Sequence, residues 1–225
     1  MTHRTIRLAP GPWRAQRGFT LVELTLVVLV AGFLAVTTAA AREMLATTRA
    51  KALAREMSAV RLAIDSYQDR FHALPGDDPH ASTHVTGATT ASGAGNGVID
   101  GAWDSLDPGG ESTLLWQHLR LAGLMPAAPE GGEGDPRPRH VADGVLGANS
   151  ATPSQGQVAG LGGFLQVCAG SVPGRMAKVV DRLLDDGASD TGTVRVVAQG
   201  APPASPAIAT ANIDDGAAYV VCQAY

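Results

Sequence analysis

The sequence predicts an α+β protein in which a long N-terminal α-helix packs on a small antiparallel sheet, with short helices and long loops. Three observations predict this. Residues 19–74 contain no proline and show helical periodicity, and Pro75 follows them directly. Most of the 27 glycines and 14 prolines come later in the chain. Short runs rich in valine near the C-terminus are typical of strands.

The long helix has two halves of different character. Residues 19–41 contain Glu23 as their only charged side chain and, as a helix, would rise about 34 Å, enough to span a bilayer core of about 30 Å. Residues 42–74 are amphipathic, with apolar side chains at alternating steps of three and four. That stripe comprises Ala46, Ala50, Leu53, Met57, Val60, Ile64, Tyr67 and Phe71.

A basic leader precedes the helix. Residues 1–18 carry Arg4, Arg7, Arg14 and Arg17 and no acid, and a basic leader before an apolar run places the chain after it on the exported side of the membrane. We therefore expect a single-pass inner-membrane protein with residues 75–225 in the periplasm. The alternative is an ordinary signal peptide cut after Ala41, since residues 39–41 are small.

Glu23 is the unusual residue of the apolar run. A carboxylate inside a membrane segment costs a few kcal/mol, so such an acid suggests a functional partner. A simpler interpretation is that Glu23 reaches the lipid headgroups from near the helix start.

The stretch "RGFTLVELTLVVLVAGFLAV" resembles the start of type IV prepilins and type II secretion pseudopilins. The resemblance implies cleavage by prepilin peptidase between Gly18 and Phe19, then N-methylation of Phe19 by the same enzyme. Residues 1–18 are then the leader peptide, and Glu23 pairs with the Phe19 amine of a neighbouring subunit during assembly. Within a low-dielectric bundle such a pair sets register, because leaving either charge alone is strongly penalised.

The same resemblance implies partners and location. We expect other pilin or pseudopilin subunits, prepilin peptidase and an inner-membrane assembly platform as partners, and a periplasmic or surface filament as the product. Many pilins have a proline where this chain has Ala40, which favours a minor or pseudopilin-like subunit. The rival function is a secreted binding or enzymatic domain.

The body, residues 75–225, is predicted to open with a turn at Pro75 and Gly76, followed by a surface loop over 79–101. A helix follows, with Leu114, Leu115, His118, Leu119 and Ala122 on one face. Residues 126–160 are expected to form an extended or mobile connection.

The last third of the body alternates predicted strands with one helix. A strand is expected around Leu165, and two more in "TVRVVAQ" and "AAYVVCQAY". A helix between them is predicted to point Met176, Val179, Val180, Leu183 and Leu184 inward. The motifs "LPGD", "GNGVIDG", "ESTLLWQHLRLAGL" and "DRLLDDGASDTG" resemble, in order, those of a set of pilin-like proteins, which implies the pilin fold and no catalysis.

Two acid clusters are the candidates for a metal. They are Asn96, Asp100 and Asp104 in one loop and Asp185, Asp186 and Asp190 in another. Oxygen-rich loops can bind calcium, but no EF-hand spacing is present, and we predict capping roles and no resident metal or cofactor. His80 and His84 are expected to be solvated loop residues, and His118 to be a core residue.

Cys168 and Cys222 are the two cysteines of the chain. In an oxidising compartment they are expected to form a disulfide, although two buried thiols are the alternative. Phosphate-loop, nucleophile-elbow and zinc motifs are absent from the sequence, and no basic patch follows the leader. We therefore predict a structural subunit and neither an enzyme nor a nucleic-acid-binding protein.

Overall fold

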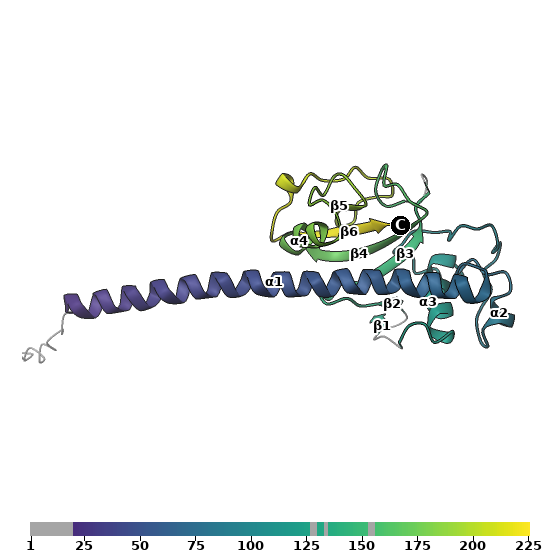
Figure 1. Ribbon diagram of the computed structural model, residues 1–225, viewed down its shortest axis with the longest axis horizontal. Helices are drawn as coiled ribbons and strands as arrows, with labels where there is room; N and C mark the ends of the chain where they lie inside the picture. Colours follow the sequence, from purple (N-terminus) through teal and green to yellow (C-terminus); the bar gives the residue numbers. More distant parts are fainter. Residues whose placement is uncertain (1–19, 127–129, 133–134, 153–155) are drawn as a thin grey trace, which may run out of the picture. The chain divides into compact units, whose positions relative to one another are not determined.

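The computed structural model describes residues 20–126, 130–132, 135–152 and 156–225, and the backbone alone for residues 36–42 and 130–132 (Figure 1). The chain divides into two compact units, Met1–Glu43 and Met44–Tyr225. Helix α1 (Leu21–Phe71) begins in the first unit and ends in the second. The α+β class predicted from the sequence is confirmed.

The second unit is built on the amphipathic part of α1. Six residues of the predicted stripe have exposed fractions of 0–1%: Ala50, Leu53, Met57, Val60, Ile64 and Tyr67. Full burial of each large apolar side chain contributes about 1.5–3 kcal/mol, which fixes this helix face against the body. On the outer face, Arg61 and Asp65 form an ion pair at 2.7 Å, one turn apart.

The sheet that covers this stripe has four antiparallel strands in the order β3-β4-β6-β5 (Figure 1). They are β3 (Leu146–Ser150), β4 (Leu165–Pro173), β6 (Ala218–Ala224) and β5 (Val194–Ala198). Residues alternate between two cores, as the two-residue period of a strand requires. Val167 and Val221 join the core with α1, while Cys168 and Val220 join a smaller core that also holds Trp103.

Both edges of the sheet are covered by loops. At the β3 edge, the Ser150 amide donates to the Ile99 carbonyl at 3.1 Å. At the β5 edge, the Val196 amide donates to the Ser189 carbonyl at 3.0 Å, and the Ile208 amide donates to the Val196 carbonyl at 2.8 Å. Covered edges leave little free backbone for unwanted strand pairing.

Short helices complete the body. They are α2 (Ala81–His84), α3 (Glu111–Leu121), α4 (Gly174–Leu184) and a 3₁₀ turn at Thr210–Asn212. The predicted inward face of α3 is confirmed at Leu114, Leu115, His118 and Leu119.

The predicted inward face of α4 is wrong in part. Leu183 is 44% exposed, whereas Asp181 is fully buried. The buried stripe runs through Met176, Ala177 and Val180 to Asp181, and Leu183 lies at the solvent-facing edge of this stripe.

Two predicted loops are also corrected. Residues 126–160 contain β1 (Glu130–Gly132) and β2 (Asp135–Pro138), an antiparallel pair, as well as β3. The predicted loop over 79–101 contains α2, and Ile99 within it is fully buried. Glycine, proline and alanine content suggested irregular structure in both places. Within residues 126–160, pairing with β4 over the full length of β3 overrides this local propensity.

Candidate functional site

The first described turn of α1 holds Glu23. The Thr20 hydroxyl oxygen accepts a hydrogen bond from the Glu23 amide at 3.2 Å, so Thr20 caps the helix and Glu23 is its third residue. Thr-Leu-Val-Glu is the pattern of a capping box, and an acid here also meets the positive end of the helix dipole. Glu23 is exposed within this unit. Gly18 and Phe19 lie outside the described residues.

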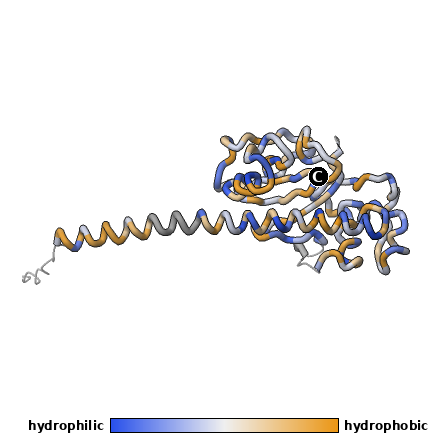
Figure 2. The backbone as a smooth tube through the Cα atoms, viewed as in Figure 1, coloured by the Kyte–Doolittle hydropathy of each residue, from blue (hydrophilic) through white to orange (hydrophobic). Residues whose placement is uncertain are grey.

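The first turns of α1 are mostly hydrophobic by residue hydropathy (Figure 2), and many large apolar side chains of residues 21–34 are exposed. Leu21 is 79% exposed and Leu29 is 70% exposed. Exposed apolar surface of this extent is typical of a segment that meets lipid or a protein partner. The other large exposed apolar residues of this segment are Val22, Leu24, Leu26, Val27, Val28, Val30, Phe33 and Leu34. Within the described part of the chain, no helix has both the length and the apolar character needed to cross a membrane.

In the first acid cluster, the side chains act as caps and turn formers. Asn96 Nδ2 donates to Asp100 Oδ2 at 3.0 Å, and the Val98 amide donates to Asn96 Oδ1 at 2.7 Å. Asp104 takes part through its backbone carbonyl, which accepts from Arg137 Nη1 at 2.9 Å. The buried Asp77 accepts hydrogen bonds from the amides of Gly95, Asn96 and Gly97 and thereby shapes this loop.

The second cluster differs from its predicted membership. Asp185 Oδ2 accepts from the amides of Thr193 and Val194 at 2.5 Å and 3.0 Å. Asp186 accepts from the Ala188 amide at 2.8 Å and the Thr191 hydroxyl at 3.0 Å. The residue whose carboxylate lies with these two is Asp181, not Asp190. Asp181 was not predicted from the sequence, although its position one turn after Ala177 on the α4 stripe is a usable signal.

His84 is not the solvated loop residue that the sequence predicted. Its Nδ1 lies 2.7 Å from Oδ2 of the fully buried Asp78, and its ring stacks on Phe71 with centroids 5.3 Å apart. Helix α2 forms here despite Pro79, because the His80 amide donates to Asp78 Oδ1 at 2.8 Å and opens the turn. Burial would raise the pKa of Asp78, but hydrogen bonds from His84, Tyr67 and the His80 amide lower it below its usual value.

His118 is a core residue, as predicted. Its Nδ1 accepts from the Gly76 amide at 2.9 Å, so the ring is neutral and Nε2 donates to the Thr89 carbonyl at 2.8 Å. Burial lowers the pKa of His118, which keeps the proton off Nδ1. The ring therefore ties the turn after α1 to α3.

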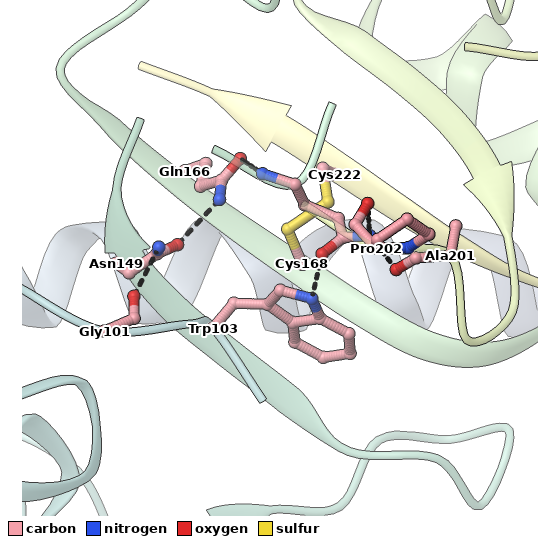
Figure 3. Close-up of a disulfide and its surroundings, with 9 residues drawn as sticks. Gly101, Trp103, Asn149, Gln166, Cys168, Ala201, Pro202 and Cys222 are labelled. Carbon is pink, nitrogen blue, oxygen red and sulfur yellow. Dashed lines mark hydrogen bonds between the residues drawn. A yellow bond between two sulfur atoms is a disulfide. The ribbon is translucent and has the colours of Figure 1, made fainter. Parts of the chain in front are cut away.

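The expected pairing of Cys168 with Cys222 is present (Figure 3). The two residues face each other across β4 and β6, and both are fully buried. The Trp103 indole lies beside the disulfide, and its Nε1 donates to Gln157 Oε1 at 3.0 Å. Gln166 Nε2 donates to Asn149 Oδ1 at 2.7 Å, and Asn149 Nδ2 donates to the Gly101 carbonyl at 2.8 Å, so a polar chain joins β4, β3 and the loop before α3.

Comparison with known proteins identifies the N-terminal segment. Residues 13–39 match the family model described as the prokaryotic N-terminal methylation motif. The chain carries a prepilin-type segment. This methylation motif, the cleavage and methylation segment of type IV pilins and pseudopilins, includes Gly18, Phe19 and Glu23. It indicates a pilin-like or pseudopilin-like substrate of prepilin peptidase. No curated protein and no solved structure matches the chain.

Proposed function

We propose that the chain is a structural subunit, a minor pilin or pseudopilin, of a type IV pilus or type II secretion pseudopilus. The methylation motif over residues 13–39 carries this proposal. Prepilin peptidase cuts between Gly18 and Phe19 and methylates the new amine. The subunit joins a filament through its N-terminal helix, and no catalytic role is assigned to its body.

Residues 19–41 anchor the subunit in the inner membrane before assembly, with residues 75–225 in the periplasm. The large apolar side chains exposed along residues 21–34 support this part of the proposal. In the filament the same side chains meet those of neighbouring subunits, because removal of so much apolar surface from water is strongly favourable. Residues 42–74 carry the body.

Glu23 sets the register of assembly by pairing with the Phe19 amine of an adjacent subunit. The helix start supports this assignment, since Glu23 sits in the first turn, close in sequence to the new N-terminus. Its capping position gives Glu23 a second possible role, the local support of its own helix start. Pairing with the amine requires the negative charge of Glu23, whereas capping of the helix requires only a hydrogen-bond acceptor.

Glu23→Ala and Glu23→Gln separate these roles. Glutamine also serves in a capping box but carries no charge for the amine, so we expect both variants to be processed normally and to reach filaments at about a tenth or less of the wild-type amount. The measurement is the amount of subunit in sheared or purified filaments, with cleavage followed on gels. Normal incorporation of Glu23→Gln would exclude the ion pair as the assembly determinant.

A secreted binding or enzymatic domain, released after Ala41, is the alternative. An unbroken helix through residues 39–41 disfavours it, because α1 runs from Leu21 to Phe71 without interruption at the small residues. The two functions give different mature N-termini, Phe19 or Arg42.

A further inference from the structure

Helix α2 places two histidines one turn apart, where the sequence predicted a loop. His80 is the N-cap residue of this helix, and the His84 amide donates to the His80 carbonyl at 2.9 Å. Side chains four residues apart on a helix are neighbours, and here the two ring centroids lie 5.9 Å apart with their planes inclined by 75°. Two imidazoles that share a zinc ion place their ring centres about 5–6 Å apart, because each Zn–N bond is about 2 Å long. The spacing of the pair therefore fits one shared ion.

A buried carboxylate fixes the tautomer of His84. Oδ2 of the fully buried Asp78 lies 2.7 Å from His84 Nδ1, and the same oxygen accepts from the Tyr67 hydroxyl at 2.8 Å. The lowered pKa of Asp78 keeps this carboxylate ionised, and an ionised carboxylate only accepts hydrogen bonds. Nδ1 of His84 therefore carries the proton, and Nε2 keeps its lone pair. A carboxylate behind the ring in this way is the usual support of a metal-binding histidine.

Both histidines line a cavity of about 340 Å³ beside the end of α1. The ring of His84 is held there by its stack on Phe71, and His80 is exposed to solvent. Within the described part of the chain, no hydrogen bond occupies the His80 ring or Nε2 of His84. The lining includes Asp77 and Asp78 but no lysine or arginine, so its charge favours a cation.

We propose that His80 and His84 bind a divalent transition-metal ion of the zinc class at this cavity. Imidazole nitrogen suits such ions, whereas carboxylate and carbonyl oxygen suit calcium and magnesium. Nε2 of His84 and a ring nitrogen of His80 are the protein ligands, and water completes the coordination. Asp78 is a positioning residue that acts through His84 and does not contact the ion. The proposal goes beyond the filament function and does not depend on it.

Binding would brace the turn that follows α1. Helix α2 is a single turn, and the Asp78 carboxylate opens it through the His80 amide. An ion held by His80 and His84 would join the two ends of that turn. Because an ion that binds only the folded state stabilises it, zinc should raise the melting temperature.

Isothermal titration with ZnCl₂ tests the proposal on the full-length protein in detergent micelles, without a polyhistidine tag. We expect saturable binding of one ion per chain at this site. His80→Gln and His84→Gln should each weaken the affinity by at least about tenfold, because each removes a ligand. His72→Gln is the matched control, since His72 is exposed and lines the same cavity but lies outside α2. This control should leave the affinity unchanged.

His80→Gln is the decisive variant, because the exposed His80 ring makes no hydrogen bond that the fold could lose. Circular dichroism checks the fold of each variant, and zinc should raise the melting temperature of the wild type but not of His80→Gln. The proposal is overturned if the wild type shows no saturable zinc binding, or if His80→Gln binds zinc as tightly as the wild type. It is also overturned if His72→Gln and His80→Gln lose affinity equally. These outcomes leave the filament function untouched.

Discussion

At the scale of single residues, Asp181 shows how a buried acid makes stability depend on pH. Its pKa in the folded protein is raised from 3.8 to about 6, by burial first and then by the neighbouring Asp186 and Asp185. A raised pKa means that the folded state favours the protonated form. The stabilising contribution of Asp181 is therefore full below about pH 4 and is lost as the pH rises through about 6.

Asp181→Asn should remove this dependence. We expect the unfolding free energy of the variant, relative to wild type, to increase by roughly 2–3 kcal/mol between pH 4 and pH 7. Chemical denaturation at a series of pH values measures this difference. Asp190→Asn is the matched control and should show a flat difference. A relative stability of Asp181→Asn that stays constant or falls with pH would contradict the burial argument.

The sequence led to the other two acids but not to Asp181. A charged residue in a short helix is normally placed on the solvent side, so the predicted inward face of α4 included Leu183 and left out Asp181. The structure buries Asp181 because Ser189 donates to it, and the Thr210 hydroxyl lies 3.1 Å from that of Ser189. These donors are 8 and 29 residues further along the chain, and local periodicity cannot place them.

At the scale of elements, α1 offers a direct test of the predicted stripe. Leu53 is fully buried against the sheet, whereas Leu62 on the same helix is 67% exposed. Leu53→Ala should cost about 2–5 kcal/mol through lost transfer energy and the cavity left behind, while Leu62→Ala should change stability by no more than about 0.5 kcal/mol. Denaturant unfolding of the full-length protein in micelles measures both. Equal costs would contradict the assigned packing of α1.

Elements with strong periodicity could be predicted, and those held by tertiary pairing could not. The long helix, α3 and the strands β4, β5 and β6 follow from apolar patterns in their own residues. The strand β3, with the sequence "LGANS", has no such pattern, and its full pairing with β4 defines it. The same holds for α2, whose turn depends on the buried Asp78 carboxylate.

At the scale of the whole molecule, the function rests on the N-terminal segment more than on the body. The methylation motif covers residues 13–39, and the sequence already indicated it through the leader, the Gly18–Phe19 junction and Glu23. The body contributes a disulfide-linked sheet packed on residues 50–71, with no catalytic constellation assigned to it.

Mass spectrometry of the mature N-terminal peptide tests the central claim most directly. The protein is produced together with prepilin peptidase, recovered from membranes and digested. We predict a chain that begins at Phe19 and carries one methyl group on its amine. A chain that begins at Arg42, or one that retains residues 1–18 when an authentic prepilin in the same cells is cut, would contradict the account.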